Sequence, residues 1–144
     1  MTKYILMNRY FLFLVLVIIF FSCNAKRNDK VVDDLSKQTT TVEVIDTSYN
    51  FGTIKEGEKV QYSYRFKNTG RYPLVINDAT ASCGCTVPEK PDKPIMSGDT
   101  GFIKVVFDSK GKSNHVVKTI TITSNANPPF RELLLNGDVI KSDH

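Results

Sequence analysis

Val60-Gln-Tyr-Ser-Tyr-Arg-Phe-Lys67 decides the fold of this chain. Apolar and polar residues alternate along it without a break, which is the pattern of a β-strand with one buried and one exposed face. The apolar face consists of Val60, Tyr62, Tyr64 and Phe66. Glu56-Gly57-Glu58 precedes the stretch and Asn68-Thr69-Gly70 follows it, and both contain residues that tolerate tight reversals. The sequence therefore predicts a strand between two turns.

Six further segments have the composition of strands: residues 74–79, 101–107, 115–123 and 130–140 strongly, and residues 41–45 and 51–54 more weakly. Residues 101–107 are apolar on both faces, so we expect that strand to be central in a sheet. No segment shows helical periodicity. About seven short strands predict an all-β fold, an immunoglobulin-like antiparallel sandwich at residues 41–140. The chain has no Trp, so "immunoglobulin-like" describes the layout only.

The N-terminus has the parts of an export signal. Lys3 and Arg9 precede an apolar run at residues 10–21. Its twelve residues fit the roughly 7–15 of a signal-peptide core and fall short of the roughly 20 that span a bilayer. The sequence therefore predicts that the chain is exported.

Ser22-Cys23 closes the apolar run and resembles the bacterial lipobox, in which a cysteine is lipidated and becomes the new N-terminus. The resemblance implies a lipoprotein signal peptide at residues 1–22 and a lipid anchor on Cys23. Phe20 and Phe21 stand where a lipobox usually has an aliphatic and a small residue. The alternatives are an uncleaved membrane anchor, or ordinary cleavage that leaves Cys23 unmodified.

Charge and composition limit the remaining possibilities. The formal net charge of +4 falls to about +2 once Lys3 and Arg9 are removed, and a nearly neutral chain lacks the basic face that nucleic-acid binding requires. Residues 23–40 are polar and aperiodic, so we expect a flexible linker there, and residues 141–144 form a polar tail. What remains is the size of one domain.

Five short motifs can be read together: Phe51-Gly52-Thr53-Ile54, Phe66-Lys67-Asn68-Thr69-Gly70, Pro73-Leu74-Val75-Ile76, Ser82-Cys83-Gly84-Cys85-Thr86 and Ser97-Gly98. Over residues 43–139, their order and spacing resemble a bacterial family of domains of unknown function, family 1573, common in lipoproteins of the Bacteroidota. That family is similar to the seven-stranded sandwiches of cilium and centrosome proteins and of major sperm protein. The resemblance implies the fold and supplies no activity. Where this chain has Ser97-Gly98, the family often has Pro-Gly, which affects loop stiffness.

Cys83-Gly84-Cys85 is the candidate site. In an extended chain, the two cysteines project to the same side with Cα atoms about 6.6 Å apart, at the upper limit for a disulfide unless Gly84 bends the backbone. Three interpretations stay open: two packed thiols with Gly84 at a bulge, a local disulfide that is stable or cycles, and a two-thiolate Cu(I) site. Pro88, Pro91 and Pro94 then predict a stiff, exposed loop or a protected sheet edge.

No motif indicates catalysis. His115 has no nucleophile or base motif around it, and the chain has no phosphate-binding loop, metal-ligand cluster or nucleophile elbow. We expect no enzyme activity, no cofactor, no metal and no small-molecule substrate. The favoured interpretation is a lipid-anchored envelope protein whose sandwich docks other envelope proteins, with a thiol-redox or Cu(I) protein as the alternative. Because Asn24-Ala-Lys-Arg-Asn28 is basic, we expect an outer-membrane anchor that faces the periplasm.

Overall fold

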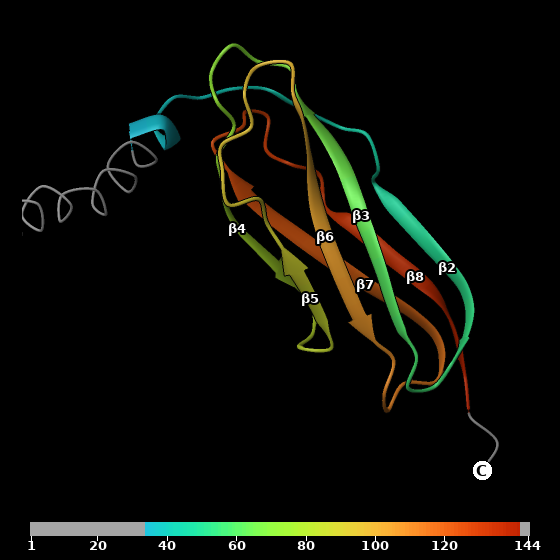
Figure 1. Ribbon diagram of the computed structural model, residues 1–144. Helices are drawn as coiled ribbons and strands as arrows, with labels where there is room; N and C mark the ends of the chain where they lie inside the picture. Colours follow the sequence, from blue (N-terminus) through green and yellow to red (C-terminus); the bar gives the residue numbers. More distant parts are fainter. Residues whose placement is uncertain (1–33, 142–144) are drawn as a thin grey trace, which may run out of the picture. The chain divides into compact units, whose positions relative to one another are not determined.

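The computed structural model describes residues 34–141; the expected signal peptide at residues 1–22, the lipidation site Cys23 and residues 142–144 lie outside that range. Two four-stranded sheets make up the described part (Figure 1). The first sheet has the order β1 (Val42–Val44), β3 (Lys59–Asn68), β6 (Thr100–Asp108) and β5 (Thr86–Glu89). The second has the order β2 (Ser48–Lys55), β8 (Leu133–Ile140), β7 (Asn114–Ser124) and β4 (Ile76–Ala81).

The apolar faces of the two sheets meet in one core, so the predicted all-β sandwich is confirmed. Tyr64 and Phe66 of β3 are 1% exposed, and Val60 and Tyr62 pack against the same cluster, which confirms the predicted inner face of this strand. The opposing side chains include Ile120, Ile122, Leu133, Leu135 and Val139. Removing this apolar surface from water is the main force that holds the sheets together.

One hydrogen bond joins the two sheets, and one close contact joins β2 to β8 within the second sheet. The hydroxyl of Tyr64, from the first sheet, donates a hydrogen bond to the carbonyl oxygen of Leu134 in the second, at 2.8 Å. The ring of Phe51 lies against Gly137, where a Cβ would stand 2.3 Å from a ring carbon. Any larger residue at position 137 would collide with the Phe51 ring, so the position of this ring requires glycine there.

The strand pattern differs from the expected one in three respects. β5 is an additional strand, at Pro88 in the stretch expected as a loop or protected edge, and it lies at an edge of the first sheet. β2 pairs with β8 in parallel, whereas we expected antiparallel pairs throughout. β6 is central as expected, but its Phe102 is 52% exposed, so the second apolar face of this strand is open to solvent.

The folded unit begins at Asp34, before the expected boundary at residue 41. Residues 34–36 are helical. The side-chain amide of Asn125 donates to the carbonyl oxygens of Leu35, at 3.3 Å, and Gln38, at 2.6 Å. The described part of the expected linker is therefore held against the sandwich. No helix within residues 34–141 is long and apolar enough to cross a membrane.

Candidate functional site

Cys83 and Cys85 lie in the link between β4 and β5, where the chain passes from the second sheet to the first. The structure joins them in a disulfide with Cα atoms 5.3 Å apart. The distance is shorter than in an extended chain because the backbone N–H of Thr86 donates to the Cys83 carbonyl oxygen, at 3.2 Å, and closes a four-residue turn. Packed thiols and a Cu(I) thiolate pair would both require the reduced sulfurs.

Gly84 is not needed for this turn. Its φ lies outside the left-handed region, and a Cβ on it would meet nothing within 4 Å. Neither backbone conformation nor packing therefore requires glycine at this position. Gly84 is exposed, whereas Cys83 and Cys85 on either side of it are half-buried.

On the other side of the turn, the Thr86 hydroxyl lies beside both sulfurs. Its Oγ1 is 3.6 Å from Cys83 Sγ and 3.9 Å from Cys85 Sγ, and Thr86 is 3% exposed. Sulfurs in a disulfide carry no hydrogen, so the hydroxyl is the donor. Cys85 also packs against the core. The sulfurs of these two half-buried cysteines therefore lie beside a buried hydrogen-bond donor.

Lys118 is a cation on β7, the strand that pairs with Ser82 at the start of this turn. It precedes Thr119 in β7, and Thr119 exchanges hydrogen bonds with Ser82: Ser82 N donates to Thr119 O at 2.9 Å, and Thr119 N to Ser82 Oγ at 3.2 Å. The Lys118 ammonium nitrogen lies 5.9 Å from the centre of the Phe107 ring. Phe107 is the strand partner of Thr86, so the half-buried residue Lys118 contacts the neighbour of the residue that lies beside both sulfurs.

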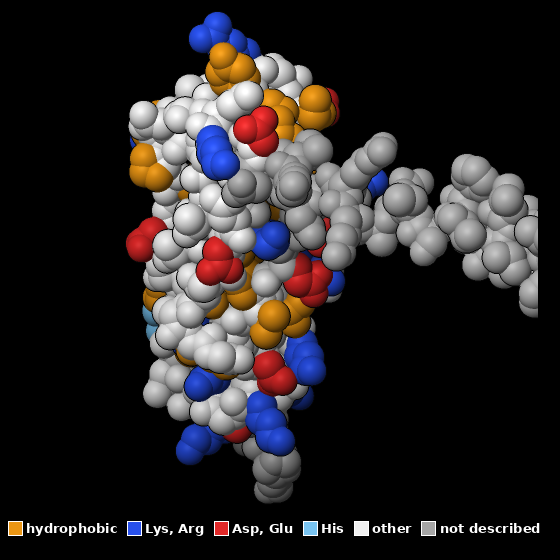
Figure 2. All heavy atoms as spheres, turned by 90° about the vertical axis from the view of Figure 1, so that its left-hand side faces the viewer, with side chains coloured by type: hydrophobic (Ala, Val, Ile, Leu, Met, Phe, Trp, Pro, Cys, Tyr) orange, Lys and Arg blue, Asp and Glu red, His pale blue; other side chains and the backbone are white. Residues whose placement is uncertain are grey.

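The other charged groups are arranged as on an ordinary protein surface. His115 pairs with Asp138 at 3.0 Å, but their side chains are 60% and 57% exposed. In the described range, no group of three or more His, Cys, Asp or Glu side chains could hold a metal ion. Figure 2 shows acidic and basic side chains interspersed on the face turned toward the viewer. These groups define no second charged site.

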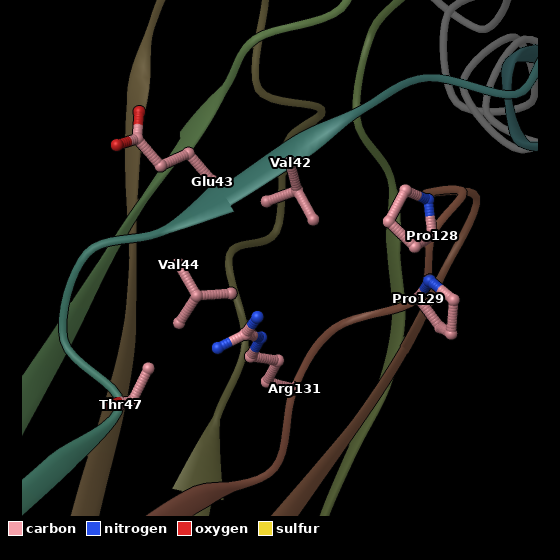
Figure 3. Close-up of a pocket in the computed structure, with 7 residues that line it drawn as sticks. All are labelled: Val42, Glu43, Val44, Thr47, Pro128, Pro129 and Arg131. Carbon is pink, nitrogen blue, oxygen red and sulfur yellow. The ribbon is translucent and has the colours of Figure 1, made fainter.

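A groove of about 290 Å³ lies beside β1. Val42 and Val44 point into it, as does Arg131, whereas Glu43 points away (Figure 3). The groove forms because the chain leaves the second sheet between residues 40 and 48. Thr40 bridges Ala126 and Ser48 pairs with Leu134, but β1 between them pairs with β3 of the first sheet. Pro128 and Pro129 line the opposite side of the groove from β1. Proline has no backbone N–H, so these two residues cannot donate a hydrogen bond to β1.

The edges of the first sheet differ from each other. β1 pairs with residues 66–68 of β3, and Arg65 contacts the residues that follow β1, but no described strand covers residues 59–63 on that side. The Arg65 carbonyl oxygen accepts from Ile45 N at 3.0 Å, so the backbone groups of alternate residues, including Gln61 and Ser63, face the open edge. On the opposite edge, Asp108 N donates to the carbonyl oxygen of Cys85, so the backbone groups of Cys85 and of every second residue after it face β6. The nitrogen of Pro88 therefore faces outward, and it carries no hydrogen that an added strand could use.

These features define an immunoglobulin-like sandwich with one half-open edge and a turn disulfide. The chain belongs to the family described as "Protein of unknown function (DUF1573)", whose model matches residues 42–139. This confirms the resemblance read from the five motifs. No curated protein matches the sequence.

Solved structures show the same fold. A protein of unknown function from Porphyromonas gingivalis W83 is similar with a TM-score of 0.60 and 20% identity over 72% of this chain and 48% of that one. The chain thus corresponds to about half the length of that protein. An ASH/PapD-like domain of human CEP192 gives a TM-score of 0.54 and 14% identity, over 72% of this chain and 88% of that one. At these identities the likeness concerns the fold alone.

Sequence reasoning found the cysteines but not all their neighbours. The motif includes Thr86, but its sequence does not predict that the Thr86 hydroxyl lies beside both sulfurs, and nothing in the motif points to Lys118. The signal was present, because Lys118 falls on the Ile120 and Ile122 side of the alternating segment, where every other residue is apolar. The contact that the structure gives this lysine is with the ring of Phe107.

Proposed function

We propose that the protein is a lipid-anchored component of the cell envelope whose sandwich docks other envelope proteins and performs no catalysis itself. The observation that supports this best is the open edge of β3. Gln61 and Ser63 direct their backbone groups away from β6, and no described strand pairs with them. An extended segment of another protein can add to such an edge through main-chain hydrogen bonds, without any catalytic group.

The two edges of the first sheet are suited to different tasks. β5 is four residues long, and Pro88 removes a donor from the middle of its outer side. The open half of β3 has no such block. Sequence thus protects one edge of the sheet against pairing and leaves the other available.

The position of the open edge suits a tethered protein. The β2–β3 turn, from which the open half of β3 begins, lies at the opposite end of the sandwich from the helical segment at residues 34–36 (Figure 1). Cys23 and Asp34 are eleven positions apart in the sequence, a stretch that spans at most about 40 Å when fully extended. In our proposal, lipids on Cys23 hold the chain in the outer membrane, facing the periplasm, and the open edge is left free for a partner.

Crosslinking in cells tests the docking surface. A photo-crosslinkable amino acid at Ser63 of the full chain should form adducts with envelope proteins, and the same group at exposed Thr121 on the second sheet should form few. Gln61→Pro should abolish the Ser63 adducts because proline has no N–H for an added strand. The β3–β6 ladder keeps its hydrogen bonds in this variant, since the N–H of Gln61 points the other way.

Gln61→Ala is the matched control, since it removes the side chain and keeps the backbone donor. It should retain the adducts, and circular dichroism should show that both variants are folded. Adducts that survive Gln61→Pro in the folded protein, or equal adducts at Ser63 and Thr121, would contradict docking at this edge.

A further inference from the structure

The Cys83–Cys85 disulfide is poorly placed to act as a staple. It encloses a single residue, and the stabilisation that a crosslink gives by restricting the unfolded chain is smallest for the shortest loops. The turn is also held without it. Ser82 N donates to Thr119 O at 2.9 Å, Thr86 N to Cys83 O at 3.2 Å and Asp108 N to Cys85 O at 2.9 Å. Breaking the S–S bond leaves these hydrogen bonds in place.

The surroundings of the sulfurs fit a thiolate better than they fit a purely structural bond. The buried Thr86 hydroxyl lies 3.6 and 3.9 Å from the two sulfurs and would donate to a thiolate formed at either one. Lys118 follows the same pairing: it adjoins Thr119, the partner of Ser82, and its ammonium lies 5.9 Å from the ring of Phe107, the strand partner of Thr86. A cation in the vicinity of a thiol favours its ionised form. Both sulfurs belong to half-buried residues, and Gly84 between them is exposed.

We propose that Cys83 and Cys85 form a thiol–disulfide exchange site that oxidises the dithiol of a partner protein. One thiolate of the partner attacks a sulfur of the pair, the Cys83–Cys85 bond breaks, and the other cysteine leaves as a thiolate. The second thiolate of the partner then displaces the mixed disulfide. The partner loses two electrons and two protons and gains a disulfide, while Cys83 and Cys85 become two thiols. Thr86 and Lys118 stabilise the leaving thiolate.

The test is a redox titration of the full mature chain in detergent, with reduced and oxidised dithiothreitol as the probe. Alkylation followed by the mass of the peptide that carries Cys83 and Cys85 separates this pair from Cys23. The pair should reduce reversibly while circular dichroism shows an intact fold. Thr86→Val and Lys118→Met should each require about fivefold more reductant relative to oxidant, because each removes one favourable interaction with the thiolate.

Matched controls are Thr121→Val and Lys67→Met, which should leave the midpoint unchanged. Gly84→Leu gives a second, kinetic measurement. It should slow reduction several-fold without moving the midpoint, because a bulky side chain between two half-buried cysteines hinders the approach of the reductant. A disulfide that resists reduction until the domain unfolds, a domain that unfolds on reduction, or midpoints for Thr86→Val and Lys118→Met that equal the wild-type value would each overturn the proposal. None of these outcomes depends on docking at β3.

Discussion

At the scale of single residues, Asn68 shows how one buried side chain orders several loops. It is fully buried, and its amide donates to the carbonyl oxygens of Tyr72, at 2.8 Å, and Ile95, at 2.9 Å. Its Oδ1 accepts from Thr40 Oγ1, at 3.0 Å, and from Gly70 N, at 3.1 Å. The sequence predicts a turn at Asn68-Thr69-Gly70 from the conformational tolerance of Asn and Gly. The structure gives another reason for Gly70, whose Cβ would overlap the Thr40 side chain.

Asp46 predicts a pH dependence of stability. Arg65 Nε lies 2.8 Å from its Oδ2, and this hydrogen-bonded pair lowers the pKa of Asp46 below its ordinary value of 3.8. A carboxyl group whose pKa is lowered by folding stabilises the fold above the unfolded pKa, and that contribution is lost as the pH falls through the folded value. The Tm of Asp46→Asn should therefore be lower than the wild-type Tm at pH 7, and the difference should shrink as the pH falls through the lowered pKa of Asp46.

Thermal unfolding followed by circular dichroism between about pH 2 and 7 measures this difference. Asp92 is exposed and serves as the control. The Asp92→Asn variant should track the wild type across the whole range. A Tm deficit of Asp46→Asn that stays constant with pH would show that the Asp46 charge is not its cause.

At the scale of strands, we predict that Pro88 on the outer side of β5 prevents this edge strand from pairing with another copy of the protein. Pro88→Val restores a backbone N–H at the middle of this edge, beside Val87, which is 56% exposed. We expect the variant to self-associate at high concentration, as sedimentation velocity would show, because an unblocked edge strand pairs with another copy. Its stability should stay within about 1 kcal/mol of the wild type, since the site lies at the surface. A variant that remains as monodisperse as the wild type would show that Pro88 does not protect the edge.

Alternation predicted strands well where one face is buried and the other exposed, as in β3 and β7. It failed for β5, because that strand is short, contains proline and pairs on one side only. It also gave no sign that β2 runs parallel to β8. Strand direction depends on how the chain crosses between the sheets at residues 45–47, and the pattern within a strand carries no information about that crossing.

The candidate site was predictable only in part for a similar reason. The sequence placed Cys83 and Cys85 together but left packing, disulfide and metal open, because the distance between them depends on whether the chain is extended or turned. The turn is set by the hydrogen bond between Thr86 and Cys83 and by pairing of Ser82 with Thr119, a residue far along the chain. Such pairing is a property of the assembled sandwich and not of the motif.

At the scale of the whole molecule, the anchor proposal predicts where the protein is found. Each buried acyl methylene stabilises the membrane-bound state by about 0.8 kcal/mol. Cys23→Ser should therefore move the chain from the membrane fraction to the soluble or precursor form, and intact mass should show that the lipids are gone. The double variant Cys83→Ser, Cys85→Ser should stay in the membrane fraction. If Cys23→Ser remained firmly membrane-bound, the apolar run at residues 10–21 would be acting as an uncleaved anchor.

The attachment of residues 35–40 to the top of the sandwich has a mechanical consequence. In a protein that is tethered at its N-terminus and grips a partner at the far half of β3, any tension enters through the Asn125 contacts and β1. β1 and β3 are antiparallel neighbours, so the load runs along the strands and strains their hydrogen bonds together, in shear, and does not open them one after another. If the protein is anchored and docked as proposed, the short β1 would resist pulling along the strand direction.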